Sequence, residues 1–336
     1  MTWAKKFLKN SFRNLRKKSP QKPKLIIVVG PTASGKSGLG IFLALRLSSG
    51  QAQKQFGIQG AEIISADSRQ IYRGMNLGTG KVKKDKRLSA EFYSNGIRHH
   101  LLDVANPRKD FSVAQYKKLG EKAIADIFRR GKIPIIVGGT GFYINALLGQ
   151  DFPEVPPNRQ LRSQFEKLTV EVLFQKLKDL DPRRANTIDA KNKRRLIRAL
   201  EIVLATGKTV PKIESKLKYD VLWLGLNPKN LQERIKKRLG RRFQEGMVAE
   251  VAGLHKQGVS YRRLENFGLE YSWIAQYLQK DISEPVMKDG LLKAIFHYAK
   301  RQMTWFKRNR ETRWIPSKLQ ALKLSSEFLK DSGDLR

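Results

Sequence analysis

The stretch GPTASGKS at residues 30–37 has the residue types and spacing of a phosphate-binding loop. It follows an apolar run at 25–29 and precedes apolar residues at helical spacing, so we expect a strand, a glycine-rich turn and a helix. In that setting backbone N–H groups and the helix N-terminus bind a polyphosphate, Lys36 adds a positive charge, and the Ser37 hydroxyl can reach a phosphate-bound Mg²⁺. The predicted phosphate-binding residues are Gly30, Pro31, Thr32, Ala33, Ser34, Gly35, Lys36 and Ser37. The motif leaves open which polyphosphate is bound, and whether it is transferred, hydrolysed or expelled.

Two further predicted strands end in polar residues that could do chemistry. The strand predicted at 61–65 is followed by Asp67 and Ser68, and the strand predicted at 133–137 is followed by a glycine-rich turn that contains Thr140. Since ligands gather at the carboxyl ends of parallel strands, we expect these side chains beside the phosphate loop. A P-loop hydrolase would usually end the second strand with a metal-binding carboxylate. Its absence argues against a motor-type NTPase.

The chain carries a large positive charge: 67 Lys and Arg against 30 Asp and Glu give +37 over 336 residues. Such a field attracts polyanions, so nucleic acid is the leading partner and an anionic membrane surface the second. The chain has no cysteine, which excludes disulfides, cysteine-based metal sites and thiol catalysis. No apolar run approaches the ~20 residues needed to cross a bilayer, so we expect a soluble protein with no membrane partner.

The pattern of elements predicts an α/β fold: a P-loop-type parallel sheet core flanked by helices, with a small all-helical insertion domain. The predicted parts are a basic N-terminal arm at 1–23, a catalytic core at 24–150 and 221–316, a helical insertion at 151–220 and a loosely held C-terminal tail at 317–336. The arm has no acidic residue. It could be an RNA-contacting helix, a disordered tail, or a targeting or membrane-surface segment.

The most basic part of the predicted insertion is KNKRRLIR at 191–198. In the helix that it begins, Leu196, Leu200 and Val203 would face a core. The basic face of that helix would be left to solvent or to a phosphate backbone, and the net charge favours the phosphate backbone.

Other local signals are simpler. In the helix predicted at 231–245, Arg234 and Arg238 lie four residues apart and share a face. Ser112 and Gln115 have the spacing of a capping box at the start of another helix.

The adjacent His99 and His100 lie in a predicted strand and point to opposite faces, so we do not expect them to share a metal. Tyr72, Phe142 and Tyr143 are possible stacking partners for a base, although aromatic residues at such positions are more often part of the core.

Together these motifs resemble the tRNA dimethylallyltransferases, also called tRNA isopentenyltransferases. The resemblance covers roughly residues 25–316, and its motifs occur in the family's order: GPTASGKS at 30–37, ADSRQIYRGMNLGTGK at 66–81, HHLLDV at 99–104, FSVAQY at 111–116, VGGTGFYINALL at 137–148, NKRRLIRALEI at 192–202 and ERIKKR at 233–238. Near Gly268 the family usually has a Gly-Tyr pair, often with Arg or Gln three residues before the glycine. Here the run is ENFGLE at 265–270, which predicts a polar turn whose acidic residues would weaken contact with tRNA.

The resemblance implies transfer of a dimethylallyl group from dimethylallyl diphosphate to the exocyclic N6 amine of the adenosine 3′ to the anticodon in tRNA, with release of diphosphate. The phosphate loop would then hold the leaving diphosphate instead of ATP. The adenine would have to leave its stack to enter the pocket. The resemblance also implies Mg²⁺ as cofactor, the tRNA anticodon stem-loop as partner, a monomer and a cytoplasmic location.

The resemblance assigns catalytic roles to three residues. Asp67 matches the general base, Thr140 matches the threonine beside the reacting centre, and Arg238, with Arg234 on the same helix face, matches an arginine on the diphosphate. Ser37 would contact Mg²⁺ through the diphosphate. The implied tRNA-binding residues are Asp67, Ser68, Arg69, Gln70, Thr140, Arg162, Arg194, Arg195, Leu196, Ile197 and Arg198.

Two other functions are compatible with parts of the sequence. A P-loop kinase of a nucleoside or small metabolite would use the same loop on ATP, with Asp67 as base for a hydroxyl. A basic nucleic-acid-binding NTPase would need no transferase chemistry. The basic stretch at 191–198 and the missing acidic strand end favour the prenyltransferase over both.

Overall fold

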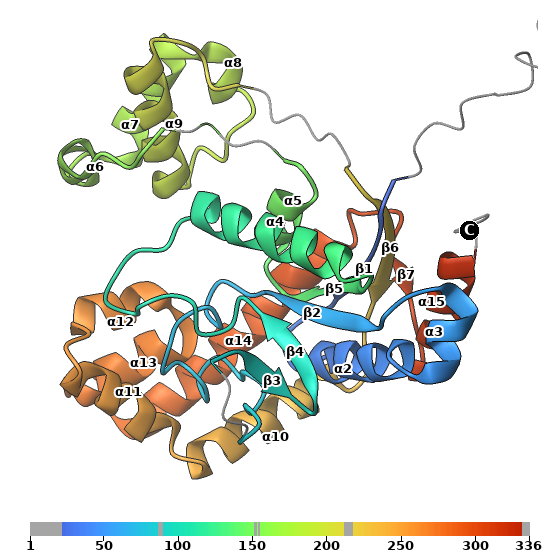
Figure 1. The fold of residues 1–336 in the computed structure, drawn as a ribbon. Helices are drawn as coiled ribbons and strands as arrows, with labels where there is room; N and C mark the ends of the chain where they lie inside the picture. The colour runs from blue at the N-terminus through green and yellow to red at the C-terminus, as the bar shows by residue number, and fades with distance from the viewer. Residues whose placement is uncertain (1–21, 87–89, 151–152, 154, 212–217, 331–336) are drawn as a thin grey trace, which may run out of the picture.

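The computed structural model describes residues 22–86, 90–150, 153, 155–211 and 218–330. Almost all of the predicted basic arm at 1–23 therefore lies outside the described residues. A seven-stranded sheet has the order β3-β4-β2-β5-β1-β6-β7 (Figure 1). Its strands are β1 (Lys24–Val29), β2 (Ala61–Ala66), β3 (Phe92–Ser94), β4 (Ile97–His100), β5 (Ile133–Gly138), β6 (Asp220–Gly225) and β7 (Arg313–Trp314). Every neighbouring pair is parallel except β3 and β4, which confirms the predicted α/β class with a P-loop-type sheet.

The central strands are aliphatic and buried on both faces, as expected of a parallel sheet covered by helices on both sides. The five residues from Leu25 to Val29 in β1 have no exposed surface. In the register of the sheet, Ile27 lies opposite Ile136 of β5 and Trp223 of β6. Because β1, β2 and β5 run in the same direction, the loops that follow them meet at one edge of the sheet.

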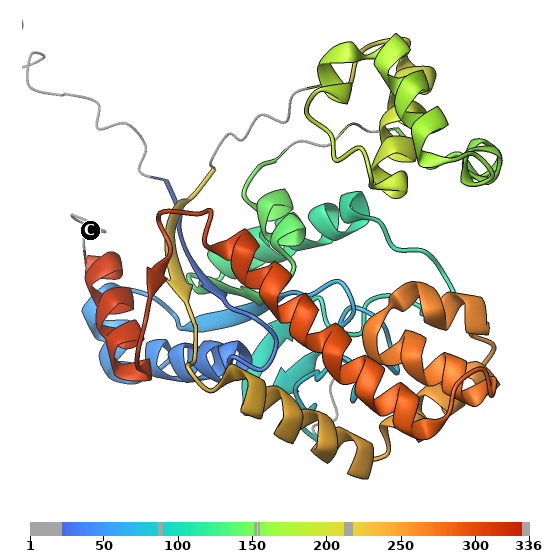
Figure 2. The same ribbon diagram turned by 180° about the vertical axis from the view of Figure 1, so that it is seen from behind.

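Helices cover both faces of this sheet (Figures 1 and 2). On one face lie α4 (Val113–Arg129) and α5 (Gly141–Leu147), and on the other lies α2 (Lys36–Leu47), which is followed by α3 (Gly50–Phe56). The predicted capping box of α4 is confirmed: Ser112 Oγ accepts a hydrogen bond from the backbone of Gln115, whose side chain accepts one from Ser112 N–H.

The segment after β7 forms a helix, α15 (Lys318–Lys330), on the same face as α2. Ala321 and Leu329 are buried there. The prediction of a loosely held tail is therefore wrong for the described part of 317–336. Apolar residues at helical spacing hold the segment against the sheet, since they would otherwise be left in water.

A layer of helices lies beyond the edge where the loops after β1, β2 and β5 meet, and α14 runs from this layer back to the sheet (Figures 1 and 2). The layer consists of α10 (Leu231–Gln244), α11 (Met247–Lys256), α12 (Tyr261–Phe267), α13 (Leu269–Leu278) and α14 (Glu284–Phe306). The polar turn predicted at 265–270 is wrong. Only Gly268, with φ at +73°, separates α12 from α13, and buried Leu264, Phe267 and Tyr271 anchor both helices.

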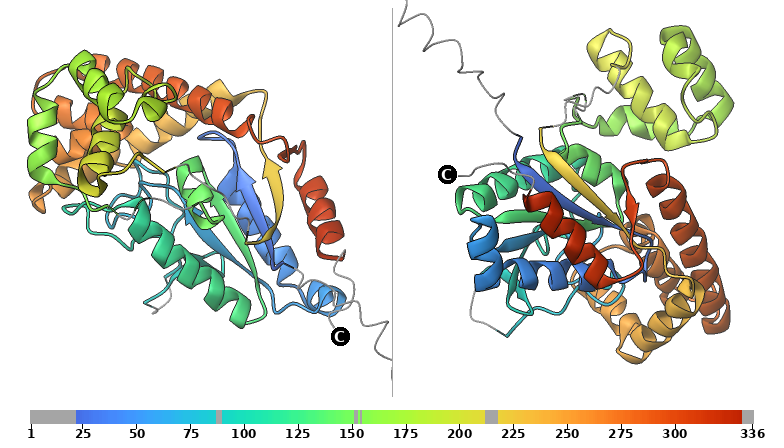
Figure 3. Two further views of the ribbon diagram at one scale, coloured as in Figure 1. Left: turned by 90° about the horizontal axis from the view of Figure 1, so that it is seen from above. Right: turned by 90° about the vertical axis from the view of Figure 1, so that its right-hand side faces the viewer.

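The chain between α5 and β6 forms a separate helical unit, α6 to α9, which stands apart from the sheet (Figure 3). Its helices are α6 (Arg159–Glu166), α7 (Val170–Leu180), α8 (Pro182–Ala185) and α9 (Lys193–Thr206). Leu196 and Leu200 lie in a core of the unit's own with Leu173 and Leu177, as predicted for the inner side of α9. Among the residues that the structure describes, no helix is both long and apolar enough to span a bilayer.

One buried carboxylate ties this unit together. Glu201 is 1% exposed and accepts hydrogen bonds from Arg162 Nε and Nη2, both at 2.7 Å, and from Asn158 N–H at 2.9 Å. We expect Glu201→Ala to lower the free energy of unfolding of the unit by about 1–3 kcal/mol, because these donors lose their partner. Denaturant unfolding and limited proteolysis would measure the loss of stability. Glu166→Ala, which removes an exposed carboxylate from α6, is the control and should change neither the unfolding midpoint nor the rate of proteolysis. Equal stability of the two variants would contradict this role of Glu201.

Candidate active site

The phosphate loop passes from β1 into α2 through conformations that favour glycine. Gly35 has φ at +97°, directly before the first turn of α2. A Cβ atom on Gly30 would lie 2.7 Å from Ser34 Oγ, so a side chain at Gly30 would displace the loop. The Ser34 N–H donates to the Pro31 carbonyl at 3.1 Å, and Lys36 Nζ donates to the same carbonyl at 3.2 Å. The loop thus wraps around the N-terminus of α2, as phosphate binding requires.

Two arginines of α10 contact this loop. Arg234 donates from Nε to the Ala33 carbonyl at 2.9 Å and from Nη2 to the Ser34 carbonyl at 3.3 Å. Arg238 donates to the Thr32 hydroxyl. The predicted common face of Arg234 and Arg238 is confirmed, and it is the face turned toward the phosphate loop.

Positive charge is buried and crowded at this site. Burial lowers the pKa of Lys36 to about 8; Asp67 opposes that shift, and Arg238 and Arg242 add to it. Burial also lowers the pKa of Arg238 to about 9, and the adjacent Arg242 contributes. Desolvated like charges repel each other, so a polyanion bound between them would stabilise all three.

Asp67 and Thr140 follow the adjacent strands β2 and β5. Asp67 Oδ1 accepts hydrogen bonds from the backbone N–H groups of Arg69 at 2.9 Å and Gln70 at 3.3 Å. Thr140 Oγ1 accepts one from Ser68 N–H at 3.2 Å. The side chain of one loop therefore binds the backbone of the other, and the predicted carboxylate and threonine are held together at the edge of the sheet.

Gln302 on α14 joins the phosphate loop to the Thr140 loop, a contact that no sequence pattern predicts. Its Oε1 accepts a hydrogen bond from Thr32 N–H at 2.8 Å, and its Nε2 donates to the Gly139 carbonyl at 2.9 Å. The side chain is 6% exposed. A Cβ atom on Gly139 would lie 2.2 Å from Nε2, so the approach depends on glycine. Only the packing of α14 against the sheet brings these groups together.

Buried ionic contacts hold the loop after Met75. Glu250 accepts hydrogen bonds from the backbone N–H groups of Leu77 at 2.6 Å and Gly78 at 3.1 Å. Arg242 donates to the Gly78 carbonyl at 3.3 Å and to Glu270 at 3.2 Å. Burial raises the pKa of Glu270 and Arg242 opposes the rise. Glu270 therefore points inward, so the sequence-based expectation that it faces tRNA is corrected.

Two of the predicted tRNA-binding residues near Asp67 have side chains that donate hydrogen bonds to backbone carbonyls of the protein. Arg69 Nε donates to the Phe267 carbonyl at 2.7 Å, and Gln70 Nε2 donates to the Thr79 carbonyl at 3.3 Å. Of the predicted stacking aromatics, Tyr72 and Tyr143 are buried at 4% and 6% exposure, whereas Phe142 is 49% exposed. Tyr72 and Tyr143 thus belong to the core.

The predicted tRNA-binding residues of the helical unit fall into three groups. Arg162 and Arg198 bind Glu201. Leu196 and Ile197 are buried in the core of the unit, which excludes RNA contact by their side chains because apolar packing already surrounds them. Arg194 and Arg195 lie exposed in the first turn of α9 and have side chains free to meet a ligand.

The described residues contain no group of three His, Asp or Glu side chains arranged for a metal. His99 Nδ1 lies 3.0 Å from the carbonyl oxygen of Ile97, two residues earlier in the chain. His100 Nε2 instead lies 2.8 Å from the Glu62 carboxylate. The two histidines thus have different surroundings, as predicted from their alternation in β4.

These features define an α/β enzyme of the P-loop class, in which a carboxylate and a threonine flank the phosphate loop. The family model described as IPP transferase matches residues 70–309. The tRNA dimethylallyltransferase 1 of Geotalea uraniireducens (strain Rf4) is 37% identical over 311 residues, 91% of this chain and 97% of that protein. The tRNA dimethylallyltransferase 1 of Syntrophus aciditrophicus (strain SB) is 40% identical over 292 residues, which are 84% of this chain and 89% of that protein. The chain belongs to the IPP transferase family, that of the tRNA dimethylallyltransferases.

A solved structure agrees with this membership. The crystal structure of the full-length tRNA isopentenylpyrophosphate transferase from Bacillus halodurans superposes with a TM-score of 0.64 at 31% identity. The match covers 92% of this chain and 96% of that one. Nearly the whole length of each protein therefore shares one fold.

We expect Gln302→Ala to lower the enzyme's kcat/KM by about 10- to 100-fold, because Thr32 N–H and the Gly139 carbonyl lose a buried partner worth about 1–3 kcal/mol. Steady-state kinetics would measure it. Thr304→Ala is the control, since among the described residues that exposed hydroxyl bonds only the Lys300 carbonyl of its own helix. Unchanged kinetics in Gln302→Ala would show that the two loops hold their positions without this bridge.

The lowered pKa of Lys36 predicts a pH dependence of diphosphate binding. Lys36 is a cation below pH 8 and loses its proton above it. Pyrophosphate affinity should therefore fall as the pH rises from 8 to 9, with proton uptake on binding. Calorimetry in buffers of different ionisation enthalpy would measure both. In Lys36→Ala the component of proton uptake due to this lysine should vanish; the same uptake in variant and wild type would assign it to another group.

Proposed function

We propose that this chain transfers the dimethylallyl group of dimethylallyl diphosphate to the N6 amine of the adenosine 3′ to the anticodon in tRNA, releasing diphosphate. One observation carries the proposal: Asp67 and Thr140 are held together beside a phosphate loop that Arg234 and Arg238 contact. The names of the relatives, tRNA dimethylallyltransferase, support it.

The leaving group is stabilised by the phosphate loop. As the allylic C–O bond breaks, positive charge develops on the carbon and negative charge on the diphosphate. Lys36 and the N–H groups at the start of α2 are already oriented toward that charge, so little reorganisation is needed during the reaction. Arg238 lies half-buried beside the loop, where it contacts Thr32, and adds a further cation.

The acceptor side requires a base. The adenine N6 attacks the allylic carbon while the C–O bond breaks, and the proton that N6 loses passes to Asp67. Asp67 Oδ1 is occupied by two backbone N–H groups, whereas Oδ2 has no hydrogen bond within the described part of the chain and is the oxygen that would take the proton. The amine becomes acidic as it is alkylated, so its proton can pass to a carboxylate at that stage of the reaction.

Mg²⁺ would fit this site if the diphosphate supplied most of its ligands. Mg²⁺ prefers oxygen donors and usually binds one or two protein groups together with substrate phosphates. The Ser37 hydroxyl lies in the first turn of α2 and would be the protein oxygen that reaches Mg²⁺. Ser34 Oγ is buried without a hydrogen-bond partner among the described residues, as expected of a hydroxyl that bonds a ligand. When bound, Mg²⁺ would neutralise charge on the diphosphate.

The remaining partners follow from charge and exposure. The exposed Arg194 and Arg195 of α9 would bind the phosphate backbone of the anticodon stem-loop, supported by the net charge of +37. We further propose that the enzyme acts as a monomer.

The decisive experiment mixes the protein with unmodified tRNA, Mg²⁺ and radiolabelled dimethylallyl diphosphate. Label should enter the tRNA at one adenosine, with release of one diphosphate per transfer. ATP with a nucleoside acceptor is the parallel arm. Phosphate transfer in that arm, without label in tRNA, would support a kinase and overturn the proposal.

Asp67→Asn tests the base. Asparagine keeps an oxygen that can accept from Arg69 and Gln70 N–H, but it cannot take the proton. We expect kcat to fall by about 10²- to 10⁴-fold with little change in tRNA affinity, measured by single-turnover kinetics and fluorescence anisotropy. Asp281→Asn is the control, because it removes one negative charge at an exposed position, as Asp67→Asn does at the site. A wild-type rate in Asp67→Asn would remove this carboxylate from the mechanism.

A further inference from the structure

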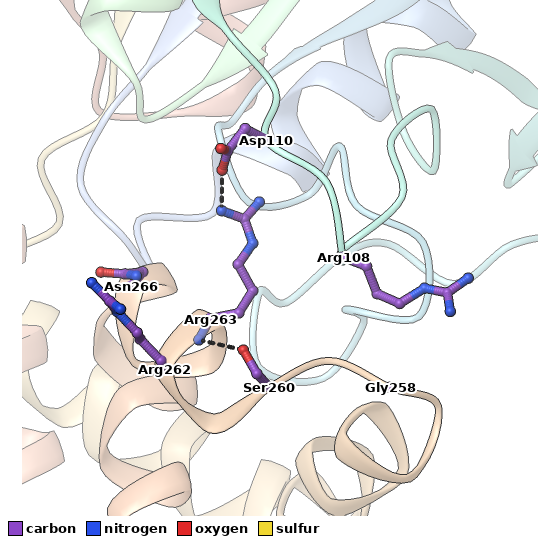
Figure 4. A pocket seen from close by; sticks show the side chains of 7 residues that line it. All are labelled: Arg108, Asp110, Gly258, Ser260, Arg262, Arg263 and Asn266. Atoms are coloured by element: carbon purple, nitrogen blue, oxygen red, sulfur yellow. Dashed lines mark hydrogen bonds and ion pairs between the residues drawn. The ribbon is translucent and has the colours of Figure 1, made fainter. Parts of the chain in front are cut away.

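A surface hollow of about 310 Å³ lies between α12 and the loop before α4 (Figure 4). We call it the arginine hollow. It is lined by Arg108, Asp110, Gly258, Ser260, Arg262, Arg263 and Asn266. No role in the proposed reaction has so far been given to any of these side chains.

The single acidic side chain of the hollow is already paired. Arg263 forms an ion pair with Asp110 and donates to the carbonyls of Pro107 at 3.0 Å and Lys109 at 2.6 Å. Its guanidinium also lies 4.7 Å from the centre of the Phe267 ring. Arg263 thus joins α12 to the loop before α4 and forms the floor between the two sides of the hollow.

The two remaining arginines are available for a ligand. Arg108 and Arg262 are exposed, and neither side chain makes a hydrogen bond or ion pair with any residue that the structure describes. Figure 4 shows Arg108 on one side of the hollow and Arg262, beside Asn266, on the other. Because the two guanidinium groups do not converge on one point, they suit an extended polyanion better than a single small anion.

The hollow is close to the acceptor side of the active site. Arg69, two residues after Asp67, donates to the Phe267 carbonyl at 2.7 Å at the end of α12. Arg263 Nη2 donates to the Tyr72 hydroxyl at 3.4 Å. Of the two acidic residues in the neighbouring segment, Glu270 is buried against Arg242, and the Glu265 carboxylate accepts a hydrogen bond from Gln279 at 2.8 Å. Neither residue lines the hollow.

We propose that the arginine hollow binds the sugar-phosphate backbone of the RNA nucleotides next to the reacting adenosine. Arg108 and Arg262 contact phosphates on the two sides of the hollow, and the Asn266 amide hydrogen-bonds a sugar or a base edge. A nucleotide turned out of its stack into the pocket leaves its neighbours at the rim, and cations at the rim hold that strand in register. This inference rests on the proposed function.

The test compares two double variants of equal charge. Arg108→Ala with Arg262→Ala removes the exposed cations of the hollow. Lys54→Ala with Lys330→Ala removes two exposed cations from α3 and α15, on the opposite face of the sheet. Binding of a fluorescent anticodon stem-loop RNA is measured by anisotropy between about 50 and 200 mM NaCl.

We expect the hollow variant to bind RNA roughly tenfold more weakly at the higher salt, and its slope of log K against log[salt] to be smaller by about 1–2. The lysine control and an Arg108→Lys, Arg262→Lys variant should keep most of the wild-type slope. Pyrophosphate affinity should stay within about threefold of wild type, which shows that the phosphate loop and the fold around it are intact.

Equal slopes in the hollow variant, the control and the wild type would overturn the proposal. So would unchanged RNA binding together with lost binding to phosphatidylserine vesicles, which would assign the hollow to a membrane surface. The binding assay also separates this inference from the proposed function. Wild-type protein that binds the RNA in this way but transfers no label would refute the transferase while leaving the arginine hollow as an RNA site.

Discussion

The crowded cations beside the phosphate loop are the constraint on which the rest of the site depends. Arg242 is buried and Lys36 and Arg238 are half-buried, so their mutual repulsion and lost hydration must be offset. Within the protein, loop carbonyls, the Thr32 hydroxyl and Glu270 provide part of that compensation. A diphosphate would provide the rest. In the reaction that we propose, the arrangement that binds the diphosphate would therefore also favour its departure from the allylic carbon.

This charge cluster is positioned by helices from the C-terminal part of the chain. α10 supplies the arginines, α13 supplies Glu270, and α14 supplies Gln302 between the phosphate loop and the Thr140 loop. The sheet alone would bring together Asp67, Thr140 and the loop backbone. The helical layer adds the charge and fixes the spacing between the donor and acceptor sides of the site.

The atypical segment at 265–270 shows how tertiary contacts change the meaning of a sequence. From the sequence, its two glutamates predicted an acidic surface that would repel RNA. In the structure Glu270 is buried on Arg242, Glu265 binds Gln279, and the outward positions of α12 carry Arg262 and Asn266. The exposed surface of α12 is basic and polar even though the linear run ENFGLE looks acidic.

Sequence patterns alone predicted the parallel core strands of the sheet, the phosphate loop, the strand-end pair Asp67 and Thr140, and the shared face of Arg234 and Arg238, but not β3. These features depend on local patterns, namely aliphatic runs, glycine spacing and helical periodicity, which one stretch of chain specifies. Four features became visible only in the folded chain: Gln302 bridges two loops, Glu270 turns inward, Ile197 is buried, and α15 packs on the sheet. Each of these depends on contacts between elements distant in sequence, and no local pattern states which side chain will meet which.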